Sequence, residues 1–459
     1  MSAHLLYNSP MVQVIIMSIA CFLCPGMFNA LNAIGGAGQV DRTVANYANT
    51  GIYCMFIVSG VFGGAVVNLT GIRWSMFVSG LTYSLYSASY IYLNHTGKGA
   101  FTIATGPILG IGAGVLWSAQ GMVIMSYPSQ DKKGRYISVF WAIFNMGGVV
   151  GGIVPFISNF DQGNSHTAVP LSSAAYIVFV ALEATGALFA LFLAPPKNVI
   201  RGDGSYAVLG DHTGVYHEVV ETLKVFQNRW MLLLIPMCIV SNFSYSYQWG
   251  AYNGSIFTLR TRGLNSMLYW TSQVLAAYVA SLIHDCQHLS RRGRGIISLL
   301  VVTVLANIMW GTTLVLQRTY THGPVKDLTT DYPGGLIDFG DPVRAAGPIM
   351  LYCFMGAVDA LWQSLAYWLI GATTNDSQAL ARYAGFYKGM QSLGAVIAWQ
   401  LDAHSVSFMT QLIVNWVIMC VAVPPMGFVA YMLKEQPYNV DPVHNDNWLY
   451  KPQTSVSYI

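Results

Sequence analysis

Charged residues are scarce in this chain. Asp, Glu, Lys and Arg together make up only 9% of its 459 residues, whereas soluble domains carry them at about a quarter of their positions. A water-facing surface cannot be built from so little charge, which argues against a soluble enzyme. The net charge is only +3, and the lysines and arginines lie scattered between apolar runs, so no nucleic-acid partner is indicated.

The sequence also lacks the motifs of common catalytic sites. It contains no phosphate-cradling loop, nucleophile elbow or kinase motif, so we predict neither an enzyme nor a bound cofactor. The seven cysteines fall almost entirely inside apolar segments, unlike an extracellular disulfide framework. Cys21 and Cys24 have redox-motif spacing, but inside an apolar helix. His284 and His288 have metal-like spacing without a third ligand, so we interpret them as solvated at a membrane edge.

Long apolar runs make up most of the chain. Hydrophobic residues reach 54%, and there are 45 glycines, a residue commoner in membrane helices than in soluble ones. A spanning helix needs roughly 20 mostly apolar residues. We predict twelve spans, at approximately 11–34, 44–68, 72–93, 101–127, 137–158, 172–194, 230–258, 267–284, 295–317, 346–370, 380–402 and 406–433.

A polar segment rich in Pro, Gly and charge, at 195–229, divides these spans into six and six. We therefore predict an all-α membrane protein of the major facilitator fold. Its parts are an N-terminal six-helix bundle at 1–194, a cytosolic linker at 195–229, a C-terminal six-helix bundle at 230–434 and a cytosolic tail at 435–459. The stretch 318–344 is predicted as the longest loop between spans.

An internal repeat supports two related halves. Leu-Trp at 116–117, Arg-Tyr at 135–136 and Phe-Trp at 140–141 are matched half a chain later by Leu-Trp at 361–362, Arg-Tyr at 382–383 and Phe-Tyr at 386–387. Convergent composition of aromatic-rich helices is the alternative explanation. Parallel halves related about the membrane normal place the substrate near the midplane between them.

The bias of Lys and Arg predicts the orientation. Loops on the side of the N-terminus carry 14 of these residues and the opposite side carries 7, so both termini are predicted to be cytosolic, in a plasma membrane or an endomembrane. Asn94 then begins an Asn-His-Thr sequon on the opposite side, which makes it a candidate glycosylation acceptor.

Three charged residues lie inside predicted spans, where each costs about 2.5–3.5 kcal/mol or more without a partner or water. Asp359 and Lys388 lie on consecutive spans, and we hypothesise an ion pair between them, either lining the transport cavity or purely structural. Glu183 in span six is either a functional base or a protonated carboxyl bonded to a neighbouring helix.

Uncharged polar residues gather on the same spans. Spans one, four, seven and ten line the cavity in facilitators, and interhelical packing is the alternative role for each residue. With the three charged residues, we predict as substrate or coupling residues Asn29, Asn32, Gln120, Asn145, Tyr245, Gln248, Gln363 and Gln391.

Closely spaced glycines predict close helix packing at a rocking interface. They are Gly60 with Gly64, and a group of four at 147, 148, 151 and 152.

The loop after the second span contains Gly64, Asn68, Gly71 and Arg73 and resembles the facilitator superfamily's loop motif, which has aspartate where Asn68 stands. In that superfamily the charged residues latch the halves on the cytosolic side. Asn68 weakens such a latch, although Arg73 could engage a helix end. We predict a cytosolic gate from these four residues and from Asp285, Arg291 and Arg292 after span eight.

Three segments resemble the Unc-ninety-three-like family of the major facilitator superfamily, in its fungal-type branch. They are Cys-Pro-Gly-Met-Phe-Asn-Ala-Leu-Asn at 24–32, Gly-Ile-Gly-Ala-Gly-Val-Leu-Trp-Ser-Ala-Gln-Gly at 110–121 and Tyr-Ala-Gly-Phe-Tyr-Lys-Gly at 383–389. The resemblance implies a facilitator fold from span one to span twelve. It carries over no substrate residues.

Two functions are open at this point. One is a secondary transporter that moves a small solute or ion, with proton coupling as one form, by alternating access. The other is a non-transporting accessory protein that regulates an ion channel or escorts membrane receptors, as the resemblance to the animal members implies. A polar site at the midplane favours transport, and a polar or aromatic patch facing lipid favours a membrane-protein partner.

Overall fold

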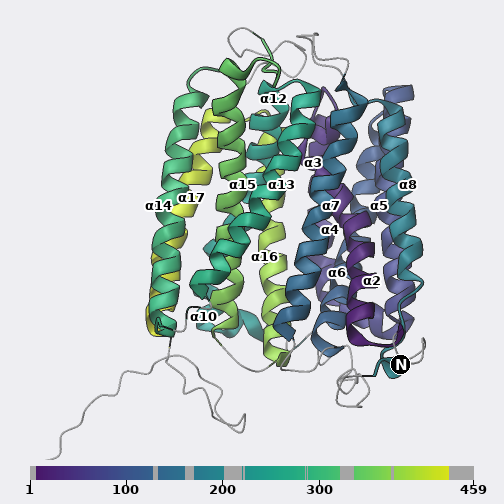
Figure 1. Ribbon diagram of the computed structural model, residues 1–459, viewed down its shortest axis with the longest axis vertical. Helices are drawn as coiled ribbons and strands as arrows, with labels where there is room; N and C mark the ends of the chain where they lie inside the picture. Colours follow the sequence, from purple (N-terminus) through teal and green to yellow (C-terminus); the bar gives the residue numbers. More distant parts are fainter. Residues whose placement is uncertain are drawn as a thin grey trace, which may run out of the picture.

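The computed structural model is all-helical in the residues that it describes, apart from one isolated bridge between Phe257 and Ile337. It describes residues 7–127, 133–160, 170–200, 220, 223–284, 286, 288–320, 335–373 and 377–433. The helices stand side by side as two groups (Figure 1), with the N-terminus at the end that we call the lower end and with α3 and α12 at the upper end.

The N-terminal half contains six membrane-length rods. The first is broken into α2 (Pro10–Cys21), the π-helix η1 (Phe22–Gly26) and α3 (Met27–Ala33), and the short η2 (Gly36–Gly38) follows it. The others are α4 (Thr43–Thr70), α5 (Ile72–Thr96), α6 (Ala100–Ser126), α7 (Lys133–Ser158) and α8 (Ser173–Ala190).

The C-terminal half repeats this plan in the described residues. Its first rod consists of α10 (Arg229–Leu233), α11 (Ile235–Tyr245), the π-helix η7 (Ser246–Asn253) and α12 (Gly254–Ile256). It continues with α13 (Leu259–His284), α14 (Arg291–Gln317), α15 (Pro342–Gly371), α16 (Ser377–Ala403) and α17 (Phe408–Met432). Two short 3₁₀ turns, η5 (Pro196–Asn198) and η6 (Val225–Gln227), lie between the halves.

The twelve predicted spans correspond to these rods, and the fold prediction is confirmed. Only the start of span eight is clearly wrong, since α13 begins at Leu259 instead of near 267. The first turns of α13 were missed because they carry Thr261, Arg262 and Asn265, polar side chains that are buried inside the protein and do not face lipid. Most of the predicted linker, much of the long loop and the tail lie outside the described residues.

The first rods of the two halves are broken in the same way. Pro25 lies inside η1, where it cannot donate a backbone hydrogen bond, and η7 occupies the matching place in the seventh span. The two rods meet at their upper ends, where Asn253 Nδ2 donates to Ala33 O at 2.7 Å. Gly35 has a φ of +82°, and a Cβ there would lie 2.5 Å from Gly254 Cα. This approach requires glycine.

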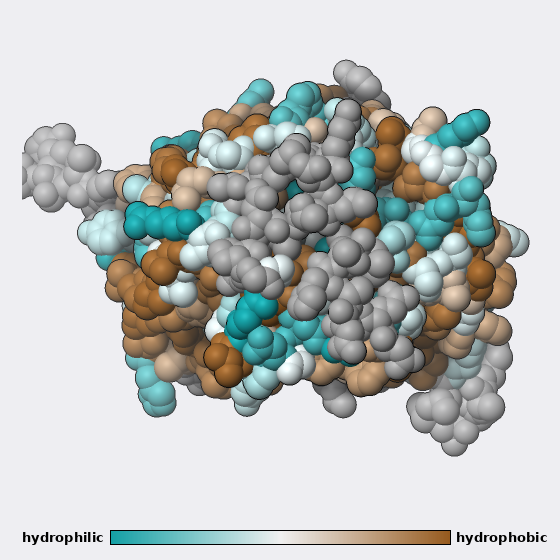
Figure 2. All heavy atoms as spheres, turned by 90° about the horizontal axis from the view of Figure 1, so that it is seen from above, coloured by the Kyte–Doolittle hydropathy of each residue, from teal (hydrophilic) through white to brown (hydrophobic). Residues whose placement is uncertain are grey.

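The outside of the molecule is apolar. Seven described helices are long and apolar enough to cross a membrane by length and composition, or eight if the bent pair Thr43–Gly60 and Phe62–Thr70 counts as one span. The remaining rods carry more polar residues on buried faces. Viewed from the upper end, hydrophobic residues form much of the outline and hydrophilic residues lie across the face (Figure 2).

The halves pack mainly through two helix pairs, α4 with α16 and α7 with α13, and α3 also meets η7 and α13. Two glycines of the group on α7 lie at this contact: a Cβ on Gly148 would lie 2.5 Å from Trp270, and one on Gly152 would lie 2.9 Å from the Met267 backbone nitrogen. The other two, Gly147 and Gly151, pack against η1 and α3 of their own half. The prediction for Gly60 and Gly64 is wrong, because a Cβ at either position would meet no atom within 4 Å.

Candidate functional site

A buried carboxyl lies at the centre of the C-terminal half. Asp359, near the middle of α15, is 6% exposed. Its Oδ2 accepts three hydrogen bonds, from Tyr245 Oη at 3.1 Å, Gln273 Nε2 at 3.0 Å and Gln363 Nε2 at 3.0 Å. These donors come from α11, α13 and α15, so one oxygen atom joins the seventh, eighth and tenth spans.

A lysine lies close to this cluster at the boundary between the halves. Lys388 Nζ donates to Gln391 Oε1 at 2.9 Å. Its ammonium lies 5.6–5.8 Å from three ring centroids, those of Trp117, Tyr367 and Tyr387, within the range of cation–π attraction. Trp117 is on α6 in the N-terminal half, so Lys388 connects the two halves near mid-height.

The hypothesised ion pair between Asp359 and Lys388 is replaced by a relay of two glutamines. Gln391 accepts from Lys388 and donates to Gln363 Oε1 at 3.3 Å, and Gln363 donates to Asp359. The charges were correctly placed on facing helices, but the intervening amides separate them. The charges of Asp359 and Lys388 still attract each other at long range, while the hydrogen bonds of each side chain are made with neutral groups.

The other predicted polar residues fall into two groups. Asn32 Oδ1 accepts from Asn49 Nδ2 at 3.0 Å, and Gln248 Oε1 accepts from Tyr269 Oη at 2.8 Å, so both serve interhelical bonding. Three others, Asn29 on α3, Gln120 on α6 and Asn145 on α7, are half-buried. The structure does not bring these three into the Asp359 cluster.

Glu183 lies apart from this cluster, inside the N-terminal half. It is fully buried on α8, which packs against α5, α2 and η1. In the described residues its carboxyl makes no well-formed hydrogen bond, but Ser87 on the neighbouring helix α5 lies beside it, so the predicted bond to a neighbouring helix stays a prediction.

At the lower end, the predicted gate is only partly assembled. Arg73 Nε donates to Leu193 O at 2.9 Å, so it engages the end of the α8 segment as predicted, within its own half. Gly71 has a φ of +79° between α4 and α5. Gly64 is half-buried and Asn68 is exposed. Arg291 and Arg292 lie at the start of α14, and Asp285 lies outside the described residues.

At the upper end, Arg42 joins the halves. It directly precedes α4 and donates through Nη1 to Gly250 O and, at 2.7 Å, to Ser255 Oγ. Its Nε lies 3.9 Å from Asp402 Oδ2 on α16. That carboxylate also accepts from Asn46 Nδ2 at 2.6 Å. The side chain of Asp402 is 1% exposed, so this charge is held by polar groups of both halves.

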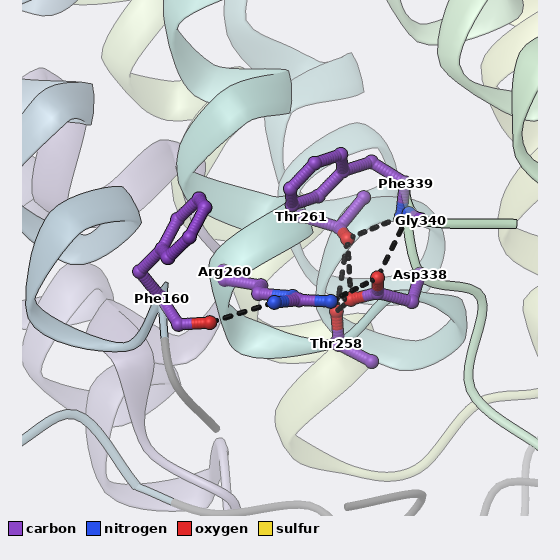
Figure 3. Close-up of polar contacts among 7 residues, drawn as sticks. All are labelled: Phe160, Thr258, Arg260, Thr261, Asp338, Phe339 and Gly340. Atoms are coloured by element: carbon purple, nitrogen blue, oxygen red, sulfur yellow. Dashed lines mark hydrogen bonds and ion pairs between the residues drawn. The ribbon is translucent and has the colours of Figure 1, made fainter. Parts of the chain in front are cut away.

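A second arginine joins the halves on the other side of the upper end. Arg260, in the first turn of α13, donates from Nη1 to Phe160 O, beyond the end of α7, at 2.6 Å. Its Nε and Nη2 bind the two oxygens of Asp338 at 2.8 and 2.6 Å (Figure 3). Its guanidinium also faces the rings of Phe160 and Phe339, at 5.7 and 4.8 Å from their centroids.

The Asp338 carboxylate is strongly stabilised in this arrangement. Burial by itself would raise the pKa of Asp338, but hydrogen bonds from Arg260, Thr258 and the Gly340 backbone, with the charge of Arg260, lower it to about 2. Asp338 therefore stays ionised at every physiological pH.

Arg42 and Arg260 were not among the residues predicted from the sequence. Both look like ordinary loop charges at the ends of spans. One signal was present: each lies at the start of the second span of its half, so the internal repeat, extended from the fourth span to the second, would have paired them.

Asn94 is also engaged at the upper end. Its Nδ2 donates to Leu171 O at 2.9 Å, and its Oδ1 accepts from Gln39 Nε2 at 3.0 Å. The predicted glycosylation stays a prediction, and a glycan would replace one of the two hydrogens of Nδ2, which now donates to Leu171 O.

Two six-helix halves with a polar centre define a membrane protein of the major facilitator fold. Solved structures of transporters share this fold: a D-xylose–proton symporter (TM-score 0.57, 13% identity, 93% of this chain and 96% of that chain) and the nucleoside transporter NupG (TM-score 0.60, 11% identity, 92% and 100%). An inward-open xylose transporter of E. coli is similar as well (TM-score 0.56, 14% identity, 94% and 96%). At these identities the likeness shows the fold alone.

Within that class, the chain belongs to the Unc-ninety-three (UNC-93) family. The family described as "Ion channel regulatory protein UNC-93" matches residues 36–424. UNC93-like protein 1 of Arabidopsis thaliana is 43% identical over 425 residues, 93% of this chain and 91% of that protein. An UNC93-like protein of Schizosaccharomyces pombe is 39% identical over 418 residues, 91% of this chain and 81% of that protein. The resemblance read from the three sequence segments is confirmed.

Proposed function

We propose that this protein is a secondary transporter that moves a small solute or ion by alternating access. The observation that carries the proposal is the polar centre: Asp359, Gln363, Gln391 and Lys388 form a continuous hydrogen-bonded relay at mid-height. Polar groups at this depth are costly unless they serve a site or a pairing. Lys388 and Gln363 are half-buried, so a solute between the halves could reach them.

The contacts between the halves support the same proposal. Contacts of Arg42 and Arg260 hold the halves together at the upper end, while Arg73 at the lower end bonds within its own half. Closure of the upper end belongs to one of the two end states that alternating access requires. Transporters with the same fold include one solved in an inward-open conformation.

The orientation and domain boundaries belong to the proposal. The lower end faces the cytosol, with both termini on that side, in a plasma membrane or an endomembrane. Residues 1–194 and 230–434 form the two moving halves, and 195–229 links them on the cytosolic side. The segment 435–459 is a cytosolic tail.

Regulation of an ion channel is the second candidate. The description of the family names this role, and exposed apolar side chains on α13, among them Leu275, Tyr278 and Leu282, offer a face for a membrane-protein partner as well as for lipid. In this case the relay would be structural.

Untargeted uptake separates the two functions. Purified protein in liposomes would be exposed to a mixture of soluble metabolites, and accumulated solutes would be identified by mass spectrometry against empty liposomes and the D359N variant. Uptake of a defined solute that D359N loses supports transport. Absence of any uptake, together with recovery of a stoichiometric membrane partner from native membranes, would overturn it.

A further inference from the structure

Glu183 is a carboxylic acid in a place where a charge is very unfavourable. It is fully buried, and in the described residues the Ser87 hydroxyl is the one polar side chain beside its carboxyl, too far or too poorly aligned for a well-formed hydrogen bond. No Lys or Arg of the described part of the chain pairs with it. An ionised carboxylate at this depth costs about 2.5–3.5 kcal/mol or more, so the neutral, protonated form is the one that fits this site.

The surroundings of the carboxyl are polar but uncharged. Ser87 on α5 lies beside it, and the Ser87 hydroxyl is itself buried without a partner. The titratable groups of this region are Cys21 on α2, Cys24 on η1, and Tyr83 and Tyr86 on α5. In the described residues, α3 and α7 present no titratable group to it. Each of these neighbours is neutral in such a setting, so no nearby charge favours the ionised form of Glu183.

The irregular turn of the first span touches α8 at this residue. Cys24 Sγ, in η1, donates to the backbone oxygen of Glu183 at 3.3 Å. The next residue is Pro25, whose missing N–H leaves the turn without one of its backbone bonds. A rearrangement of η1 would therefore change the surroundings of the carboxyl directly.

Toward the lower end, the carboxyl is closed off by tight packing. One turn below it, a Cβ on Gly186 would lie 2.6 Å from Leu23 Cβ and 2.8 Å from Cys24 Sγ. On the facing helix, a Cβ on Gly80 would lie 2.8 Å from Ala187 Cβ. On this side α5, η1 and α8 therefore approach one another closely.

Toward the upper end, a column of buried tyrosines continues from the carboxyl. Tyr86, one residue before Ser87, shares a 2.8 Å hydrogen bond with Tyr90 Oη. The Tyr90 ring stacks on Tyr176 with centroids 5.4 Å apart, and Tyr176 Oη accepts from Gln39 Nε2 at 2.8 Å. The hydroxyls of Tyr86 and Tyr90 can pass a proton by exchanging donor and acceptor roles. Tyr90 meets Tyr176 through its ring, and Tyr176 Oη donates to Ala37 O at 2.6 Å.

We infer that Glu183 binds an exchangeable proton inside the N-terminal half, and that the buried hydroxyls of Ser87, Tyr86 and Tyr90 on the upper side of the carboxyl serve its exchange. In the exchange, a proton bonds to a carboxylate oxygen of Glu183 and later leaves that oxygen, with no other bond formed or broken. If the protein is a transporter, as proposed above, this proton is its coupling ion. The existence of the proton site on Glu183 does not depend on that proposal.

Infrared spectroscopy on the purified full-length protein tests this site without any solute. At neutral pH, the wild type should show the C=O band of a protonated carboxylic acid, E183Q should lose it, and the control D338N, which removes a carboxylate that is ionised at this pH, should retain it. In deuterated water the band should shift, and Y86F, which removes the Tyr86 hydroxyl but keeps the ring, should slow that shift.

Two results would overturn the inference. The first is an unchanged band in E183Q, which would mean that Glu183 carries no proton. The second is a band that does not shift in deuterated water, which would mean that the proton is sealed and structural. Because no transported solute is involved, either result leaves the proposed transport function standing, and a failure of transport leaves the proton site standing.

Discussion

Arg42 and Arg260 occupy equivalent positions in the two halves, and each reaches across to the other half. Arg42 precedes α4 and meets Ser255 and Asp402, whereas Arg260 begins α13 and meets Phe160 O. Their targets correspond too, since Asp402 lies at the end of span eleven and Phe160 follows span five. At the upper end, each half therefore contributes one arginine, at the start of its second span, that binds the other half.

Removal of both arginines should open the upper end. We expect R42Q with R260Q to lower the free energy of unfolding by about 2 kcal/mol for each residue, since hydrogen bonds to charged groups are lost. Spin labels on Y47C in α4 and H404C beyond α16, both exposed, should report longer distances than in the parent protein. K98Q, an exposed change at the same end, is the control, and an unaltered distance distribution in the double variant would contradict the role of the arginines.

The Asp338–Arg260 pair should be insensitive to physiological pH. The pKa of Asp338 is lowered from 3.8 to about 2, so its contribution to stability is fully present above about pH 3.8 and is lost as the pH falls through about 2. The difference in thermal stability between wild type and D338N should stay constant from pH 8 to about pH 5. A difference that already changes between pH 7 and pH 5 would show that another group titrates at this contact.

Loss of the Asp359 charge should impair the centre without unfolding the protein. In D359N an amide replaces the carboxylate that accepts from Tyr245, Gln273 and Gln363. Because all three bonds end on Oδ2, the amide oxygen can accept them, but without the negative charge the bonds are weaker. We expect uptake to fall by roughly tenfold or more, which corresponds to about 1.4 kcal/mol. T313V, on the outer helix α14 and bonded only to Met309 O of its own helix, should transport normally. Equal uptake by wild type and D359N would remove Asp359 from the site.

Substitution of glycine by alanine should destabilise the protein at the contact between the halves but not at open positions. G152A places a Cβ 2.9 Å from a backbone atom of α13, and overpacking of this kind costs about 1–3 kcal/mol. G60A meets nothing within 4 Å and should be neutral or stabilising by up to about 1 kcal/mol, because alanine favours helix. Thermal unfolding in detergent compares the two, and a larger loss in G60A than in G152A would argue against the packing described.

The sequence predicts this fold well because its main signals are local. Apolar runs of spanning length and a repeat marked by Trp117 and Trp362 depend only on neighbouring residues and spacing. The start of α13 was missed for the converse reason: Arg262 and Asn265 are buried against other helices, and only the tertiary structure shows that those side chains avoid lipid.

The site was predictable in its residues but not in its contacts. Asp359, Lys388 and Gln391 stand out as polar groups within spans, but whether charges meet directly or through an amide depends on side-chain geometry of a few ångströms. Arg42 and Arg260 carry no such signal, because charges at the ends of spans are common and their significance comes from partners in the other half.

The π-helical segments η1 and η7 have a mechanical consequence. A π turn holds one more residue than an α turn, so its conversion to α-helix rotates everything beyond it by about 100° about the helix axis. The upper parts of spans one and seven, which meet at Gly35 and Gly254, could turn in this way while the lower parts stay still. The first span of each half thus contains a segment about which its upper part can rotate. This segment lies between the polar centre and the upper end, where Arg42 and Arg260 join the halves.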